Sequence, residues 1–444
     1  TVTPTSDHTG PSDSDAFDAI ISDVLPSALT WDNNVSSSGP AFTVDTSGLP
    51  TVTFTFQTIA QGATSSIDFD VILGTPVGPG QIVTNTAGLE WTSLPGADPN
   101  ERDGSGDSAC DTYADADPAE ITIADNLSIV KTLLGDGDAT IGETFQYQAV
   151  FTLNEGTMPG VELEDILDPG LAFVSQDGFS HDPSITFSGS TDPVITDQGE
   201  TVTWSLDTVV NPPGPPADTV TITYTACITN VVGNQDGTLL DNDLTLTYDG
   251  GSDWTQASDT EVLEPDLEVG KALSTQTGDA GDTVTVTVTF NHTTDSTAVA
   301  YDPVIRETVT DGLTWADNVN QGFGPATFAW DTSGLPEVVF TWDEIDTYYT
   351  AIDPVYFSFD VLIDNDVQPN EVFPDTVDLT WTSWTIGTEQ VSSYNPDAYE
   401  RSGDPDAGGE WNDYTDNDSD QITVPDLAID KVLLGDGDGV VGET

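Results

Sequence analysis

The order of apolar and polar residues along the chain predicts β-strands throughout. Residues 283–290 read Thr-Val-Thr-Val-Thr-Val-Thr-Phe, and this alternation has the period of two that is typical of a strand with one buried face. Similar short runs recur along the whole chain, separated by clusters of Gly, Pro, Asp and Ser that favour turns. No segment of useful length has the 3.6-residue period of a helix. The pattern therefore predicts an all-β protein.

The strand pattern also repeats at long range. Residues 127–138, which run from Leu-Ser-Ile-Val-Lys to Gly-Asp-Gly-Asp, return as residues 427–438, and a weaker copy lies at 267–273. Repeats at such spacing indicate tandem domains. We expect domains at 1–126, 127–266 and 267–426, each an immunoglobulin-like β-sandwich of about seven strands in an extended array. The first and third domains resemble each other most, so two domain types alternate.

The first domain is predicted to be incomplete. Residues 1–126 begin inside a second strand and lack the Leu-x-Ile-x-Lys strand that opens the other domains. The segment 427–444 supplies such a strand at the other end of the chain. Two alternatives stay open. The sequence is a window of a longer tandem array, or the terminal strand completes domain 1–126 of a neighbouring copy in a head-to-tail homopolymer.

Composition restricts the partners of the chain. Its 444 residues include 78 Asp and Glu against 6 Lys and Arg, for a formal net charge of −72. This charge excludes nucleic acid and anionic membrane surfaces as partners on electrostatic grounds. No apolar run approaches the roughly 20 residues that a membrane helix needs. Only two cysteines are present, Cys110 and Cys227, too few for a disulfide framework, although a single bridge between them stays an alternative.

The three lysines of the chain all occupy one position of the repeat: Lys131, Lys271 and Lys431. Residues two apart in a strand share a face, so each lysine belongs to the apolar row that faces the core. An unpaired buried ammonium costs on the order of several kcal/mol. Because the sequence has almost no other bases, we expect these lysines to have a chemical role.

Two further polar positions interrupt apolar rows in every domain. The first is an acid on an early strand, represented by Asp165, Glu307 and Asp23. The second is an Asn or Asp on a later strand, represented by Asn242, Asp375 and Asn85. Each complete domain is therefore expected to bury one lysine, one acid, and one Asn or Asp.

These three groups can form an intramolecular isopeptide bond. Burial lowers the pKa of the lysine and raises that of the acid, so both can be neutral together. The amine can then attack the Asn or Asp carbonyl while the acid moves the proton, with ammonia leaving from Asn and water from Asp.

We predict a Lys131–Asn242 bond with Asp165 as the helper acid. In the next domain we predict Lys271–Asp375 with Glu307, although either carboxyl of that pair could become the amide. In a head-to-tail polymer, Lys431 would reach Asn85 beside Asp23. The competing interpretation is a buried salt bridge, which Asn242 disfavours because an amide has no charge to pair.

The lysine strand, the acid before a Gly-Leu turn and the late Asn strand resemble the isopeptide-forming immunoglobulin-like repeats of bacterial or archaeal surface adhesins, pili and filaments. The resemblance covers essentially the whole chain. It implies an extracellular structural protein rather than an enzyme, either a filament subunit or the stalk of a giant adhesin whose ligand-binding head lies elsewhere. Asp375 departs from the pattern, because Asn occupies this position in the other domains, and this leaves the leaving group in doubt.

Acidic residues also gather in loops and turns, where Ca²⁺ commonly finds carboxylate ligands. The candidate ligands are Asp111, Asp115, Asp117, Asp136, Asp138, Asp413, Asp416, Asp418, Asp436 and Asp438. Strand directions predict that Asp136 and Asp138 face the 413–418 cluster across the junction of the second and third domains. A calcium ion at this junction is a hypothesis, and a solvated acidic surface is its alternative.

Overall fold

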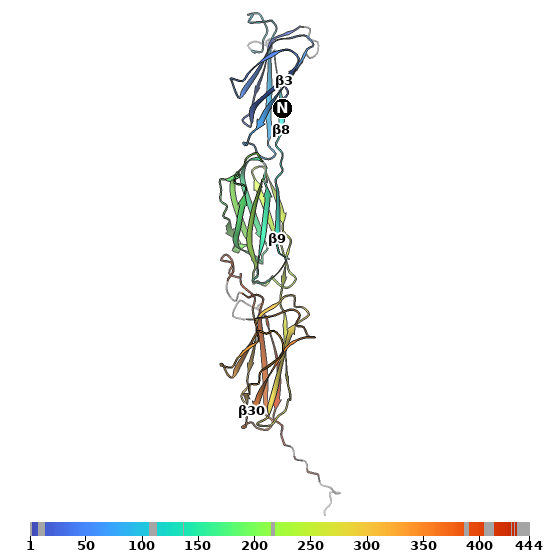
Figure 1. Ribbon diagram of the computed structural model, residues 1–444, viewed down its shortest axis with the longest axis vertical. Coiled ribbons are helices and arrows are strands. Elements are labelled where there is room, and N and C mark those ends of the chain that lie inside the picture. Colours follow the sequence, from blue (N-terminus) through green and yellow to red (C-terminus); the bar gives the residue numbers. More distant parts are fainter. Residues whose placement is uncertain are drawn as a thin grey trace, which may run out of the picture.

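The computed structural model describes residues 2–7, 14–105, 113–135, 137–214, 218–385, 390–403, 413–427, 429 and 431–432. Three β-sandwiches follow one another end to end and form a rod, with a thin tail beyond the third (Figure 1). The single helical element among the described residues is the 3-10 turn η1, Asp197–Gly199. The predicted all-β fold of tandem sandwiches is confirmed.

We call the sandwich of β1–β8 domain 1. Its sheets have the orders β1-β6-β3 and β4-β5-β2-β7-β8. The strands are β1 Thr5–Asp7, β2 Ala16–Val24, β3 Leu29–Ser38, β4 Phe42–Asp45, β5 Thr51–Ile59, β6 Thr64–Leu73, β7 Ile82–Thr92 and β8 Ala114–Thr122.

The sandwich of β9–β21 is domain 2. Its large sheets have the orders β13-β17-β11-β9 and β14-β16-β12-β19-β20, and a small sheet β10-β21-β18 lies beside them. The strands are β9 Ser128–Leu134, β10 Asp138–Thr140, β11 Thr144–Thr152, β12 Gly156–Leu167, β13 Leu171–His181, β14 Thr186–Phe187, β15 Val194–Thr196, β16 Thr201–Asn211, β17 Thr219–Ile228, β18 Leu239–Leu240, β19 Asn242–Tyr248, β20 Gly251–Gln256 and β21 Thr260–Leu263.

The sandwich of β22–β32 is domain 3, with sheet orders β22-β23-β30-β25 and β27-β28-β24-β31-β32. The strands are β22 Leu267–Leu273, β23 Thr283–His292, β24 Ala300–Thr308, β25 Leu313–Trp315, β26 Asn320–Phe323, β27 Ala329–Asp331, β28 Glu337–Thr341, β29 Glu344–Ile345, β30 Val355–Ile363, β31 Val372–Thr382 and β32 Thr415–Thr423.

Strand register aligns domain 1 with domain 3. Leu29 pairs with Leu73 in domain 1, as Leu313 pairs with Ile363 in domain 3. From that anchor, the bridge between Val2 and Phe69 corresponds to the pair Val286–Phe359. Domain 1 therefore contains the counterpart of β23 from its middle onward, and its described residues contain no counterpart of β22.

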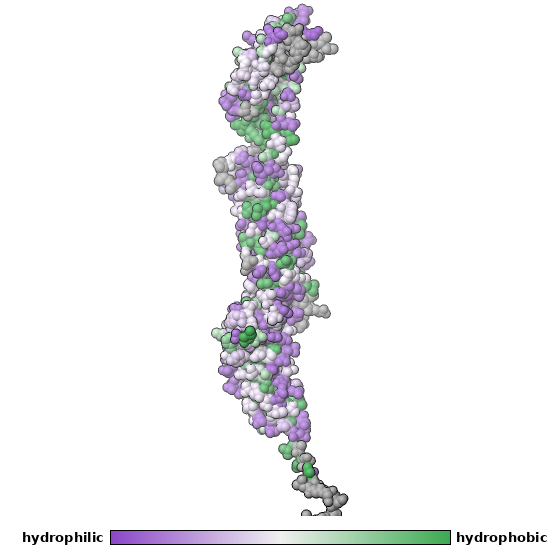
Figure 2. All heavy atoms as spheres, turned by 90° about the vertical axis from the view of Figure 1, so that its right-hand side faces the viewer, coloured by the Kyte–Doolittle hydropathy of each residue, from purple (hydrophilic) through white to green (hydrophobic). Residues whose placement is uncertain are grey.

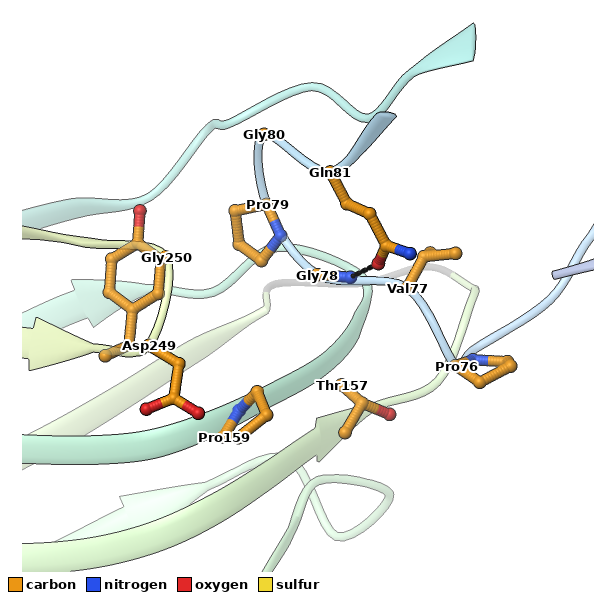
Figure 3. A pocket seen from close by; sticks show the side chains of 11 residues that line it. Pro76, Val77, Gly78, Pro79, Gly80, Gln81, Thr157, Pro159, Asp249 and Gly250 are labelled. Carbon is orange, nitrogen blue, oxygen red and sulfur yellow. Dashed lines mark hydrogen bonds between the residues drawn. The ribbon is translucent and has the colours of Figure 1, made fainter. Parts of the chain in front are cut away.

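The outer surface of the rod is mostly hydrophilic, with small separate hydrophobic patches (Figure 2). At the junction of domains 1 and 2, the loop 76–81 faces Thr157, Pro159 and the 249–250 turn across a cleft of about 600 Å³ (Figure 3). The backbone amide and hydroxyl of Thr157 donate to the carbonyls of Val77 and Thr75 at 3.0 and 2.9 Å. These bonds fasten the two domains, and the cleft lining contains no cluster of reactive groups.

Candidate isopeptide crosslinking sites

Domain 2 places the predicted lysine and its two partners on facing sheets. Lys131 lies on β9, opposite Ala149 of β11. Asp165 lies on β12 and Asn242 begins β19, both in the other sheet. The Lys131 Nζ atom is 2.6 Å from Asp165 Oδ1, and both side chains are fully buried. A Lys131–Asn242 bond would therefore join the two sheets through the core.

A tyrosine connects the acid to the asparagine. The Tyr224 hydroxyl donates to Asp165 Oδ2 at 2.7 Å, and the Asn242 amide nitrogen donates to the Tyr224 oxygen at 2.8 Å. The buried Asn242 Oδ1 has no hydrogen-bond partner among the described residues. Lys131 Nζ also lies 5.1 Å from the centre of the Tyr147 ring. The sequence analysis missed Tyr224, because an aromatic residue in an apolar strand row indicates only a core position.

Burial moves the pKa values of the reacting groups toward neutral forms. Desolvation lowers the pKa of Lys131 to about 8, although the nearby Asp165 carboxylate opposes the shift. Desolvation likewise raises the pKa of Asp165, and here Lys131 opposes it. Burial raises the pKa of Tyr224 well above its ordinary value, which keeps its hydroxyl proton in place. A neutral amine beside a neutral acid is thus accessible, as nucleophilic attack requires.

Domain 3 brings its three predicted groups into direct contact. Lys271 Nζ lies 2.8 and 2.7 Å from the two Glu307 oxygens and 2.8 Å from Asp375 Oδ2. Lys271 is on β22, whereas Glu307 on β24 and Asp375 on β31 belong to the facing sheet. Burial, reinforced by the adjacent Asp375 carboxyl, raises the pKa of Glu307 to about 9. The raised pKa favours the neutral form of Glu307, and either carboxyl could accept the amine.

Domain 1 holds the acid and the amide but no lysine. The Asn85 amide nitrogen donates to Asp23 Oδ2 at 3.0 Å, and both residues are buried. Desolvation raises the pKa of Asp23, partly offset by the Asn85 hydrogen bond. The second oxygen of each side chain has no partner among the described residues. Lys431, the predicted third member, lies exposed in the tail beyond domain 3.

A groove runs past this incomplete site. It has a volume of about 310 Å³ and lies between residues 2–6 and strand β8, with Asp23 and Asn85 in its lining. Leu89 and Ala87 are only half-buried there. Their register counterparts in domain 3, Leu379 and Val377, are fully buried beneath β22. The groove is therefore the position that a strand like β22 would fill.

The tail carries side chains that suit such a groove. Leu427 and Ile429 are 90% and 91% exposed. The residues at the same repeat positions in domain 3, Leu267 and Val269, are 2% and 8% exposed. Hydrophobic atoms of the tail are visible beyond domain 3 in Figure 2. The two apolar residues of this repeat are thus buried in β22 and exposed in the tail.

Two of the predicted calcium ligands have a different partner in the structure. The carboxylates of Asp416 and Asp418 accept the backbone amides of Val269 and Lys271, each at 2.7 Å. They join the edge of β32 to β22, where no backbone ladder links the two sheets. The sequence predicted both side chains at the junction with domain 2, and the structure places them beside the backbone of β22 instead.

The equivalent carboxylates of domain 1 are exposed. Asp115 and Asp117 lie opposite Leu89 and Ala87 in the register of β8 with β7. Asp416 and Asp418 occupy the same places opposite Leu379 and Val377. Asp115 and Asp117 therefore border the groove at the positions where a docked strand would present its amides.

The remaining acidic residues give calcium little geometric support. Within the described parts of the chain, no group of three or more acidic, His or Cys side chains is placed to hold an ion. Asp138 pairs with Glu261 between β10 and β21, and Asp413 is an exposed residue before β32. Asp111, Asp136, Asp436, Asp438 and Cys110 lie outside the described residues. Cys227 is a free, buried thiol, so the structure gives the Cys110–Cys227 bridge no support, and the calcium site stays a prediction.

Comparison with protein-family models and with curated proteins gives no match. Among solved structures, the chain is similar to the full-length major pilin SpaD of Corynebacterium diphtheriae, with 14% identity, a TM-score of 0.24 and 84% of each chain covered. It is also similar to BcpA, the major pilin subunit of Bacillus cereus, with 8% identity, a TM-score of 0.25, and 84% of this chain and 86% of that chain covered.

A third similar structure is a 35 kDa C-terminal fragment of the major pilin GBS80 of Streptococcus agalactiae, with 13% identity and a TM-score of 0.24. The similarity covers 59% of this chain and 88% of that fragment. Similarity at these scores defines neither a family nor a function. No helix among the described residues is long and apolar enough to cross a membrane.

Proposed function

We propose that this chain is a structural segment of an extracellular surface fibre, whose domains are stapled internally by isopeptide bonds. The observation that supports this function is the buried chain of contacts from Lys131 through Asp165 and Tyr224 to Asn242. Domain 3 repeats the arrangement with Lys271 in contact with both Glu307 and Asp375. The repetition in two domain types favours a common chemistry over an incidental salt bridge.

The proposed reaction in domain 2 is an aminolysis of the Asn242 side chain. The neutral Lys131 amine attacks the Asn242 carbonyl carbon, and an N–C bond forms as the bond to the side-chain amide nitrogen breaks. Protonated Asp165 gives its proton, directly or through Tyr224, to the leaving nitrogen and takes one from the attacking nitrogen, so that ammonia departs and Asp165 ends protonated as it began. In domain 3 the same attack on a protonated carboxyl releases water.

Such bonds suit a mechanical function. A Lys131–Asn242 amide links the first strand to a late strand and closes a loop of more than a hundred residues. By analogy with disulfides, a crosslink around a loop of this length stabilises a domain by about 4–5 kcal/mol. It also prevents the two strands from separating under tension. The rod shape of the chain is consistent with a spacer that transmits force along its length (Figure 1).

The groove of domain 1 favours completion of that domain by a strand from elsewhere. In a polymerising fibre, the strand is residues 427–444 of a neighbouring copy, and Lys431 bonds to Asn85 with Asp23 as helper. In the alternative, the chain belongs to the stalk of a giant adhesin and a preceding repeat supplies the strand. Both versions make the chain a self-associating or tandemly repeated structural element with an extracellular location.

Intact-mass measurement under denaturing conditions tests the crosslinks. The expected mass is lower than the calculated mass by one ammonia and one water. Lys131→Ala should restore the ammonia and Lys271→Ala the water. Asn242→Asp is the matched control, because it should convert the lost ammonia to a second water. A chain of full calculated mass would refute the isopeptide bonds, and a covalent ladder of chains would favour the polymer over the spacer.

A further inference from the structure

Domain 3 is fastened to domain 2 around a buried arginine. Arg401 is 1% exposed, and its guanidinium donates to the carbonyl of Val231 at 2.8 Å and to Asn230 Oδ1 at 3.0 Å. It also forms an ion pair with Glu264, which precedes β22 in the chain. A buried arginine with all these contacts fixes orientation, because its planar fork accepts few alternative geometries.

Further hydrogen bonds surround this arginine. The Ser383 hydroxyl donates to the carbonyl of Ile141 at 2.7 Å, and the Trp381 indole donates to the carbonyl of Pro265 at 3.1 Å. The Tyr414 hydroxyl donates to Glu264 at 2.8 Å. Glu264 and Pro265 thus form a linker to which three side chains of domain 3, Arg401, Trp381 and Tyr414, donate hydrogen bonds.

Domain 1 carries the same arrangement at its free end. The Ser93 amide donates to the Arg102 carbonyl at 2.9 Å, and the Arg102 amide donates to the Ser93 hydroxyl oxygen at 2.8 Å. Ser383 and Arg401 make the same two hydrogen bonds in domain 3, both at 2.9 Å. Trp91 stacks on Tyr113 with ring centres 5.4 Å apart. The corresponding stack of domain 3, Trp381 on Tyr414, has centres 5.7 Å apart. We call Trp91, Ser93, Arg102 and Tyr113 the end surface.

The two arrangements differ in what covers them. Arg102 is exposed and forms no ion pair with any described residue, whereas Arg401 is buried. Three arginines exist in a chain of net charge −72, and two of them occupy this one position. The loop of domain 1 is shorter, because residues 93–104 replace residues 383–403. It therefore lacks the contacts of Ser392 and Ala398 with domain 2.

We propose that the end surface of domain 1 docks a further domain of the 127–266 class, together with the Glu-Pro-Asp-Leu linker that follows such a domain. Arg102 and Tyr113 donate to the carboxylate of the linker glutamate, the Trp91 indole donates to the proline carbonyl, and the Ser93 hydroxyl donates to a backbone carbonyl of the docked domain. The proposal does not depend on isopeptide chemistry. Domain 2 of this chain is not available, because domain 3 already covers that end of it.

The linker sequence identifies the occupant. The strand of domain 3 is preceded by Glu264-Pro265-Asp266, whereas the tail strand is preceded by Val424-Pro425-Asp426. A tail from another copy could fill the groove but would place a valine where Arg102 and Tyr113 require a carboxylate. The end surface therefore favours a linker of the first kind over the tail of a second copy.

The groove continues the same surface. A strand that follows the docked linker in the register of β22 would direct two backbone amides at Asp115 and Asp117, as Val269 and Lys271 do at Asp416 and Asp418. The end surface and the groove thus form one continuous receptor. The end surface binds the linker, and the groove binds the strand that follows the linker in the chain.

The test extends the full chain by a copy of residues 127–284 placed before Thr1, because the register matches Thr1 to Thr285. Amide hydrogen exchange is measured at Ser93 and Arg102 in the extended and original chains. We expect the exchange of these amides to slow by about tenfold or more in the extended chain, as for a locally ordered interface. Arg102→Ala should reverse the slowing of the Ser93 amide in the extended chain. Arg306→Ala, at an exposed ion pair, is the matched control.

Equal exchange in the two chains, with the added domain protected and therefore folded, would overturn the proposal.

Discussion

Domains 1 and 3 are related sandwiches, and the described residues of domain 1 contain no counterpart of β22, the first strand of domain 3. In domain 3, β22 covers Leu379 and Val377, delivers Lys271 to the buried acids, and donates its amides to Asp416 and Asp418. Among the described residues of domain 1, the counterparts of these partners, Leu89, Ala87, Asp23, Asn85, Asp115 and Asp117, are in place without a counterpart of β22.

Domain 1 shows that the acid and the amide of a crosslinking site can come together before a lysine arrives. The Asp23–Asn85 hydrogen bond exists in domain 1 without a lysine, so the facing sheet preassembles the acid and the amide. The raised pKa of Asp23 has burial as its main cause, before any ammonium is near. An incoming lysine would thus meet an acid that is already adjusted toward its neutral form, and only docking of the strand remains.

The largest effect should come from removing a crosslink in domain 3. Lys271→Met leaves domain 3 with the core of domain 1 plus an uncrosslinked strand. We expect a loss of about 5 kcal/mol in its free energy of unfolding, because the closed loop exceeds a hundred residues. Urea unfolding followed by tryptophan fluorescence measures the change. Lys431→Met is the control and should leave the domain 3 transition where it is, and an unchanged domain 3 transition in Lys271→Met would show that the bond does not form.

Supplying the missing strand should convert domain 1 into a likeness of domain 3. Residues 267–284 placed before Thr1 would bury a leucine and a valine, each worth about 1.5–3 kcal/mol. We expect the unfolding midpoint of domain 1 to rise accordingly and the chain to lose a further ammonia through Asn85. The same extension with methionine in place of its lysine should keep most of the stabilisation and lose no further ammonia. If both extensions leave domain 1 unchanged, the groove does not accept a strand.

Stability of an uncrosslinked domain 3 should fall as pH rises. The pKa of Glu307 is about 9 in the folded state against 4.5 when exposed, so the folded state binds more protons between these values. The contribution of Glu307 to stability is therefore fully present below pH 4.5 and is lost progressively toward pH 9. The Lys271→Met chain, which removes the neighbouring cation that opposes this shift, should show the decline in urea midpoints from pH 5 to 9. Adding Glu307→Gln should flatten the profile, and a midpoint that rises with pH would contradict the assignment.

Much of this comparison was accessible from the sequence. Alternation such as that of residues 283–290 predicts the strands, and side-chain parity places Lys131 and Asp165 in apolar rows that can face each other. Tyr224 was not predictable, because a tyrosine in an apolar row has the same pattern whether or not its hydroxyl bonds an acid. Asp416 and Asp418 were misplaced for a related reason. One acid among 78 does not reveal whether it meets an ion, water or the backbone of a distant strand.

The carboxylates of β32 provide a smaller contrast between the domains. Asp418→Ala should lower the stability of domain 3 by about 2 kcal/mol, because it leaves the Lys271 backbone amide without its charged acceptor. Asp117→Ala should cost under about 0.5 kcal/mol, because that side chain is exposed and no strand is docked. Asp418→Asn keeps an acceptor oxygen and should be intermediate. Equal effects at the two positions would mean that the amide contact contributes little, and chemical denaturation of each variant decides the matter.

Calcium should produce the smallest change of the series. Asp416 and Asp418 already accept backbone amides, so an ion at the junction of domains 2 and 3 would depend on Asp138, Asp413 and neighbouring acids. We expect a chelator at low ionic strength to lower the stability of domain 3 by under about 1 kcal/mol, the range of an exposed ion pair. Domain 1, with its end surface uncovered, is the internal control. A larger loss of stability that Asp138→Asn abolishes would show that a bound ion stabilises the junction of domains 2 and 3. Domains 1 and 3 would then differ by a metal ion as well as by a strand.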